Sequence, residues 1–376
     1  MTADAKFFRQ LAPFAAMALT FLTLALLHTP LRAQQSLAQY DQDALARLVQ
    51  QWLDAPHADH DSLSFTYWNQ QGAVPVECAA CHSQPGFLDH LGADGSPAGV
   101  VDHPAAINQP IGCASCHTDS AHALDRVTFP SGVEVAGLGA SALCATCHQG
   151  RLSGLDVARA TETLPDDQVQ ADLGFMNIHY ATAAGVQGGR DLIAGYHYPG
   201  QSYVGTFTHV PSASTCIACH DPHSTTVESE GCLSCHRGVD DLRAIRMQHG
   251  DFDGDGSIAG GIMSEIAGLQ TQLLDAIRIY AVQVAGQPVA YAPGQYPYFF
   301  KDPDGDGQIG ADEGGFPNRY QPWTPRMLKA AYNYQLSRKD PGAYVHNPRY
   351  MLQLLHDSLA DLAGAIDLDL GRRPRP

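Results

Sequence analysis

All ten cysteines of this 376-residue chain belong to one repeated pattern, which constrains the fold more than any other sequence feature. Each pair is separated by two residues and followed directly by histidine, so the sequence C-x-x-C-H occurs five times. No cysteine lies outside these motifs. Such uniform spacing argues against a disulfide framework and points to a cofactor.

The C-x-x-C-H spacing is the attachment pattern of haem c. Two thiols two residues apart can form thioethers to the vinyl groups of one haem, and the adjacent imidazole then lies under the iron as its proximal ligand. Zinc ribbons and thioredoxin-type dithiols also contain C-x-x-C, but a histidine in fifth place of all five copies disfavours both. We therefore expect five covalently attached haems. The predicted attachment residues are Cys78, Cys81, His82, Cys113, Cys116, His117, Cys144, Cys147, His148, Cys216, Cys219, His220, Cys232, Cys235 and His236.

The motifs occupy only positions 78 to 236, so the haems must be neighbours. The chain contains 36 glycines and 24 prolines, and charged residues make up only 16%, which suggests long irregular connections. We predict a mainly α chain with extensive coil, a multihaem cytochrome c fold organised around five haems, and a C-terminal helical region.

The first 33 residues have the features of a secretory signal peptide. Lys6 and Arg9 precede an apolar run over 14–27, which is shorter than the roughly 20 residues that span a bilayer. Ala33 offers a small residue for cleavage. An uncleaved membrane anchor is the alternative, because residues 31–33 depart from the A-x-A pattern. We expect a periplasmic or extracellular protein that contacts a membrane only if this segment is retained.

The charge balance limits the partners. Aspartate and glutamate outnumber lysine and arginine by 39 to 22, and the net charge is −17. This acidity argues against nucleic acid and anionic lipid and suits redox-protein partners with basic surfaces, or cations.

Sixth ligands decide whether each iron carries electrons or binds a substrate. Removing the five proximal residues and His28 of the leader leaves twelve of the 18 histidines as candidates, more than five irons need. His223 lies three residues after His220, a reach of about 10 Å at most, so as a ligand it must serve another haem. A surface imidazole is the alternative for any single candidate.

Several short strings, two of which overlap the cysteine motifs, strengthen one resemblance. They lie at 52, 57–59, 85–89, 129–132, 147–151, 177–180, 207–209, 219–223 and 344–348. With the repeated motifs, these strings make the chain, from about residue 50 to its end, resemble the exported multihaem c-type cytochromes with doubled C-x-x-C-H motifs. The resemblance implies mostly bis-histidine iron. It makes His57, His122, His179, His209 and His223 the expected distal ligands, with His346 in reserve.

The C-terminal third contains no cysteine after Cys235 and has a different pattern. Apolar residues at helical spacing predict helices over 262–285 and 348–362, with a third over 326–334. Asn347 is the expected cap of the second helix, and Pro348 fits its first turn. We predict three parts: the signal peptide (1–33), a pentahaem cytochrome c domain (34–240) and a C-terminal helical region with calcium-type loops (241–376).

Two aspartate-rich loops lie in this third. Residues 302–313 match D-x-D-x-D-G-x5-E in full, which predicts a Ca²⁺ site; an Asp-Gly surface turn is the alternative. A second loop begins in the same way but has Ile262 at its twelfth position, with Glu265 three residues late. Gly314, Gly315 and Pro317 interrupt any helix after the first loop, so structural calcium is more plausible than a regulatory EF-hand. The predicted ligands are Asp302, Asp304, Asp306, Gln308 and Glu313, with Asp251, Asp253 and Asp255 in the second loop.

These features predict an electron carrier between redox partners outside the cytoplasm, including in extracellular electron transfer, rather than an enzyme. A multihaem reductase of nitrite, hydroxylamine or sulfur oxyanions is one alternative, and it needs an open distal position beside acid–base groups. Another is a homo-oligomer or a polymeric cytochrome filament, in which a spare histidine reaches the iron of a neighbouring subunit.

Overall fold

The computed structural model describes residues 31–371 and 373–376 and divides the chain into two units, 1–59 and 60–376. Residues 1–30, which carry most of the predicted signal peptide, lie outside the described residues. In the first unit the structure describes one long helix, α2 (Leu31–Leu53). Among the helices described, none is both long enough and apolar enough to cross a bilayer.

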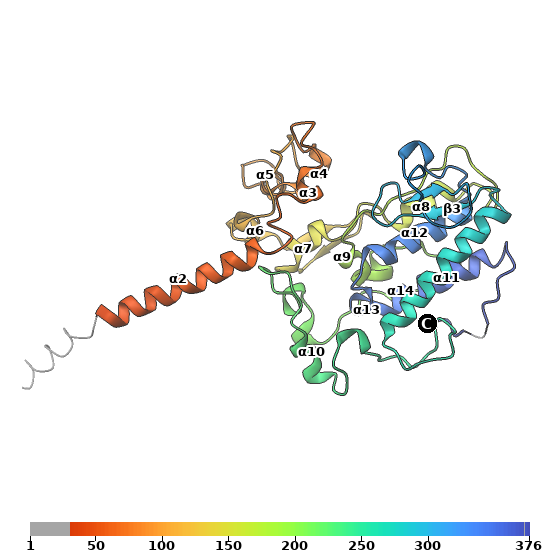
Figure 1. Ribbon diagram of the computed structural model, residues 1–376. Coiled ribbons are helices and arrows are strands. Elements are labelled where there is room, and N and C mark those ends of the chain that lie inside the picture. The colour runs from red at the N-terminus through yellow and green to blue at the C-terminus, as the bar shows by residue number, and fades with distance from the viewer. Residues whose placement is uncertain (1–30, 372) are drawn as a thin grey trace, which may run out of the picture. The chain divides into compact units, whose positions relative to one another are not determined.

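The second unit is mainly helical with little strand, as predicted (Figure 1). Its α-helices are α3 (Leu63–Thr66), α4 (Val76–His82), α5 (Gln84–His90), α6 (Asp119–Ala123), α7 (Ser141–Cys147), α8 (Gly154–Thr161), α9 (Ala183–Gly188), α10 (Ser229–Cys235), α11 (Ile262–Gln283), α12 (Pro325–Lys339), α13 (Ala343–His346) and α14 (Pro348–Leu362). Short 3-10 turns are η1 (Cys113–Ser115), η2 (Gly189–Asp191), η3 (Pro211–Ala213), η4 (Cys216–Ala218), η5 (Leu242–Ala244) and η6 (Phe316–Asn318).

Two small antiparallel hairpins complete the described secondary structure. Strands β1 (Arg126–Thr128) and β2 (Glu134–Ala136) pair with Val127 opposite Val135. Strands β3 (Val289–Tyr291) and β4 (Phe299–Lys301) pair with Ala290 opposite Phe300, and all residues of these two strands except Lys301 are buried.

The main hydrophobic core lies where α11, α12 and α14 pack together (Figure 1). Leu269, Leu273 and Ile277 recur along one face of α11 at helical spacing, and each is fully buried. The predicted helices at 262–285 and 348–362 are therefore confirmed, and the third, α12, is longer than its prediction.

Capping explains where α14 begins. The Asn347 side chain accepts a hydrogen bond from the N–H of Tyr350, with Pro348 in the first turn, as predicted. The main core also contains residues from 157–203, which precede the predicted boundary at residue 240. The division at residue 240 itself stays a prediction.

Candidate haem sites and calcium loops

Each C-x-x-C-H motif adopts one turn of helix. The N–H groups of His117, His148, His220 and His236 donate to the carbonyl of the cysteine four residues earlier, each at 2.9 Å, and His82 ends α4. In such a turn, residues at positions one, four and five share a face. The local backbone therefore presents both thiols and the imidazole of one motif on the same side, as haem attachment requires.

Motifs that are separate in sequence are neighbours in space. The thiols of Cys81 and Cys147 share a hydrogen bond, and the Cys147 thiol also lies 3.8 Å from the carbonyl oxygen of Ala80. The thiols of Cys144 and Cys216 are paired in the same way. The first motif thus adjoins the third, and the third adjoins the fourth, which agrees with the expected closeness of the haems.

Four predicted proximal histidines lie near a second histidine, with ring centres at a separation that suits one iron between them. A metal–imidazole bond is about 2 Å and a ring centre lies roughly 1 Å beyond its nitrogen, so two rings on one iron have centres about 6 Å apart. The observed centre-to-centre distances are 5.8 Å for His82–His179, 6.2 Å for His117–His223, 6.4 Å for His220–His346 and 5.9 Å for His209–His236.

The first of these sites is held in a suitable protonation state. The Nδ1 of His82 lies 2.8 Å from the carbonyl oxygen of Ser64, which leaves Nε2 for a metal. Burial, with a smaller effect of His82, lowers the pKa of His179 to about 4. Burial also lowers the pKa of His82. Both imidazoles are therefore neutral near pH 7, the form that binds iron.

The fourth motif is paired with the reserve candidate. His346, on α13, lies opposite His220, and its Nδ1 is 2.9 Å from both carboxylate oxygens of Asp340. Burial lowers the pKa of His346, but the hydrogen bond and charge of Asp340 outweigh burial and leave it raised. The carboxylate orients the ring so that Nε2 points away from it, as outer-shell carboxylates do for metal-bound histidines.

Two candidates lie beside His117. His223 is stacked nearly parallel to it, whereas the ring of His122 stands almost perpendicular at 6.4 Å. His122 follows His117 by only five residues, which is a short path to the opposite face of the same iron. Both distances suit one iron, so it is the short path that favours His223 over His122 here, in agreement with the expectation that His223 serves a haem other than that of His220.

The remaining predicted distal ligand, His57, belongs to the first unit, and its role stays a prediction. Two other histidines are held by side chains away from the motifs. His197 Nε2 lies 2.8 Å from the Tyr350 hydroxyl, and His356 Nδ1 lies 3.1 Å from Asp357.

Two contacts on ring nitrogens were not anticipated from the sequence: the Ser64 carbonyl on His82 and the Asp340 carboxylate on His346. Ser64 precedes its histidine by 18 residues, and no motif links the two. Asp340 is closer in sequence, but only the turn between α12 and α13 brings it to the ring. No local pattern could have revealed either contact.

The two aspartate-rich loops have the same backbone conformation. Asp302 accepts from the N–H groups of Gly305 and Gly307, while Asp251 accepts from those at the equivalent positions, 254 and 256. In both loops these two glycines have positive φ. In each loop, oxygens of the three predicted aspartates lie within 4.8 Å of one another. Calcium binding at both loops stays a prediction.

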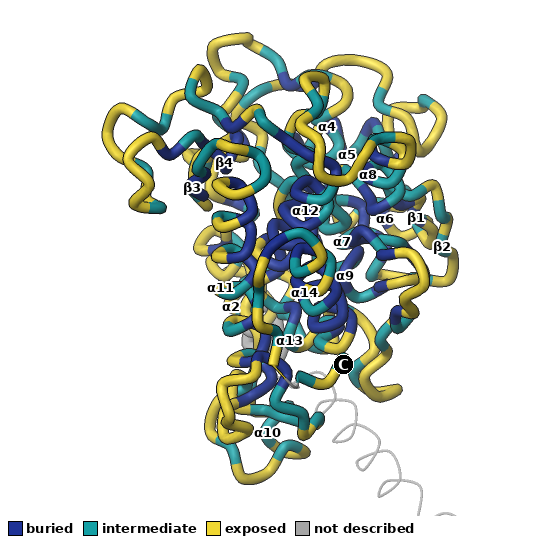
Figure 2. Tube along the Cα trace, turned by 90° about the vertical axis from the view of Figure 1, so that its right-hand side faces the viewer, coloured by how far each residue is buried: buried dark blue, intermediate teal, exposed yellow. Residues whose placement is uncertain are grey.

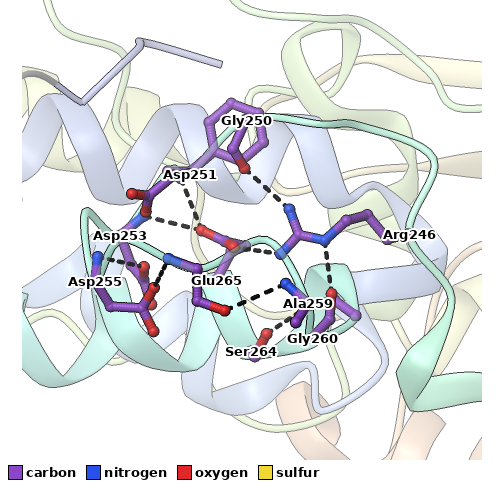
Figure 3. Close-up of polar contacts among 12 residues, drawn as sticks. Arg246, Gly250, Asp251, Asp253, Asp255, Ala259, Gly260, Ser264 and Glu265 are labelled. Carbon is purple, nitrogen blue, oxygen red and sulfur yellow. Dashed lines mark hydrogen bonds and ion pairs between the residues drawn. The ribbon is translucent and has the colours of Figure 1, made fainter.

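The loops differ in the residue that would complete each site. Glu313 accepts from the N–H of Gly310 at 2.7 Å and lies at the edge of its loop. Glu265 instead accepts from the N–H groups of Phe252 and Asp253 and forms a buried ion pair with Arg246 (Figure 3). Glu265 therefore fixes the backbone of the second loop. The sequence did not predict this role, because Glu265 lies three residues beyond the twelfth position of the calcium-loop pattern.

Comparison with known proteins independently supports a multihaem cytochrome. The chain is 23% identical over 369 residues to the C-type polyheme cytochrome OmcB of Geobacter sulfurreducens, covering 80% of this chain and 46% of OmcB. It is 24% identical over 319 residues to OmcC of the same organism, covering 75% of this chain and 36% of OmcC. The chain thus spans less than half the length of these relatives. No family model and no solved structure matches.

Both relatives are C-type polyheme cytochromes by name, and the similarity extends over most of this chain. The comparison therefore agrees with the five C-x-x-C-H motifs and supports a multihaem cytochrome.

Proposed function

We propose that this chain is an exported multihaem cytochrome c that relays electrons between redox proteins outside the cytoplasm, including in extracellular electron transfer. Five haem c groups are attached at the five motifs. When bound, haem supplies reversible one-electron exchange at iron. The protein provides two axial imidazoles to each iron and converts no substrate.

The observation that carries this proposal is the facing of proximal and distal histidines. Ring centres 5.8 to 6.4 Å apart occur at four of the five motifs, with His179, His223, His346 and His209 as the second partners. A second imidazole closes an iron to exogenous ligands and favours electron transfer over substrate binding. His57 remains the proposed ligand of one further iron, and His122 is the alternative to His223.

Calcium is the proposed second cofactor. Asp302, Asp304, Asp306, Gln308 and Glu313 form the proposed site, and a bound cation would relieve the repulsion among its carboxylates. Asp251, Asp253 and Asp255 form a proposed weaker site, because Arg246 holds the nearest additional carboxylate, that of Glu265.

The proposal is tested by counting haems and probing their iron. Intact-mass spectrometry of matured protein should give five haems per chain, and the reduced protein should not bind carbon monoxide. Four or fewer haems would reject the cofactor assignment. A stoichiometric high-spin haem with turnover of nitrite or hydroxylamine would instead establish the reductase.

A further inference from the structure

Two consecutive residues at the end of α12, Lys339 and Asp340, carry opposite charges into two different haem sites. Both side chains are almost fully enclosed: Lys339 is 6% exposed and Asp340 3% exposed. Charges in such positions are poorly screened by solvent and act strongly on their neighbours. Their effects on the two sites should therefore be of opposite sign.

Lys339 lies beside the His82–His179 site. Its ammonium nitrogen is 3.4 Å from the ring centre of Tyr180 and 4.2 Å from that of Tyr298. The ring centres of Tyr180 and His179 are in turn 5.7 Å apart. Among the described residues, no carboxylate forms an ion pair with Lys339, so two aromatic faces stabilise its charge. Burial lowers the pKa of Lys339 to about 8, which still leaves the amine mainly protonated at pH 7.

A second cation reinforces this positive environment. Arg151 interacts electrostatically with both His82 and His179. Glu77 acts on the Cys78 thiol of this motif, but its side chain is exposed on α4 and its charge is therefore screened by solvent. The charged side chains that act on the His82–His179 site, Arg151 and Lys339, are therefore both cations.

Asp340 creates the opposite environment at the His220–His346 site. Both of its carboxylate oxygens lie 2.9 Å from the Nδ1 of His346, and the N–H of Gly342 holds one of them at 3.1 Å. A carboxylate on the outer nitrogen makes an axial imidazole a stronger electron donor to its metal. It also places a negative charge close to the iron position.

We propose that Lys339 and Asp340 set the reduction potentials of two sites in opposite directions. The cation raises the potential at the His82–His179 site, and the carboxylate lowers it at the His220–His346 site. Reduction adds an electron to iron, so nearby positive charge favours the reduced state and negative charge the oxidised state. This inference rests on the proposed function, and it gives the relay a thermodynamic direction from the fourth motif towards the first.

The test is spectroelectrochemical titration of the haem-loaded full-length protein. Lys339→Met keeps the length of the side chain between the two tyrosines, and Asp340→Asn keeps an acceptor for the His346 ring. The redox transition of each site is assigned by its loss of low-spin character in His179→Ala and in His346→Ala. Lys339→Met should shift the first site to lower potential, and Asp340→Asn should shift the fourth site to higher potential.

Matched controls separate charge from packing. Lys339→Arg should retain the parent potential at the first site. Lys329→Met removes another largely buried lysine of α12, one that pairs with Asp166 at 2.7 Å, and Asp357→Asn removes a carboxylate from His356. Neither of these last two should move the first or fourth site.

Haem content, measured on the same samples, distinguishes a failure of the proposed function from a failure of this inference. Fewer than five haems in the parent protein would overturn the proposed function. Five haems with unchanged potentials in Lys339→Met and Asp340→Asn would overturn this inference alone, as would shifts of the same sign in both variants.

Discussion

The segment that carries the fourth and fifth motifs and the helices that follow it differ sharply in how they are held together. Between Tyr203 and Phe252 not one residue is buried, although this stretch contains four cysteines and several candidate iron ligands. In α12, by contrast, 12 of 15 residues are buried. Figure 2 shows the same difference between the exposed chain around α10 and the buried core of α12 and α14.

This difference identifies what stabilises each region. Ordering a residue costs about 1–2 kcal/mol of conformational free energy, which burial of apolar surface must offset. The α11–α12–α14 core has that surface, while the segment of the last two motifs has little of its own. In the proposed function, covalent haem at these motifs supplies the missing apolar surface, so the two regions should respond differently when haem is withheld.

The largest effect should come from producing the protein without haem attachment. The amides of η4 and α10, which belong to the exposed segment of the last two motifs, should then exchange with solvent at rates close to those of an unfolded peptide, because the proposed haem partners of these motifs are absent. The amides of α11, α12 and α14 should stay protected. Hydrogen–deuterium exchange of the haem-free and haem-loaded proteins checks this, and equal protection of both regions would refute the comparison.

A single core substitution should show that buried apolar side chains stabilise the α11–α12–α14 region. Leu273→Ala, at a fully buried position of α11, should lower the free energy of unfolding by about 2–5 kcal/mol. Val282→Ala on the same helix, where the side chain is 54% exposed, should cost no more than about 0.5 kcal/mol. Denaturant unfolding measures both. The haem absorption spectrum should be unchanged, and a cost below about 1 kcal/mol for Leu273→Ala would show that the core is not the source of stability.

Removing one distal ligand should have a local effect. His209 precedes the fourth motif in sequence yet faces His236 of the fifth at 5.9 Å, and His209→Ala should open that one iron to exogenous ligands. Magnetic circular dichroism should show one low-spin centre lost. His356→Ala, which removes an imidazole bound to Asp357, is the control and should leave all five centres intact. An unchanged spectrum in His209→Ala would exclude this residue as a ligand.

Calcium binding at the 302–313 loop should stabilise the C-terminal third without affecting the haem sites. Asp304→Ala combined with Glu313→Ala should remove one bound Ca²⁺ and destabilise the neighbouring core, with little change in the haem spectra. Elemental analysis gives the metal content. The same calcium content in variant and parent would contradict the assignment of the 302–313 loop.

Sequence reasoning succeeded where the determinants are local. Helices α11 and α14 follow from apolar spacing and from Asn347 before Pro348, and the shared conformation of the two acidic loops follows from their aspartates and glycines. In each of these cases, the information lies within a few turns of chain.

It could not choose among alternatives where tertiary structure decides. His346 lies opposite His220 although 126 residues separate them, and the sequence offered it only as a reserve. Glu265 was weighed only as a late calcium ligand, but folding brings Arg246 to it. Choosing among twelve spare histidines requires the three-dimensional path of the chain, which spacing does not encode.

The smallest expected effect concerns pH and the second acidic loop. Burial, followed by the charges of Glu265, Asp255 and Asp251, raises the pKa of Asp253 from 3.8 to about 6. In calcium-free protein the folded state therefore binds a proton between these values that the unfolded state has released. The free energy of unfolding should fall as pH rises through this window and level off above it.

Asp253→Asn removes this titration and should flatten the pH dependence over the same window. The measurement is the difference between the urea unfolding free energies of parent and variant at pH 4, 5, 6 and 7 in the presence of a chelator, because all other carboxylates are common to both. Parallel curves would show that Asp253 has an ordinary pKa. Added Ca²⁺ should stabilise the parent mainly above about pH 6, because a cation binds the ionised carboxylate and competes with the proton.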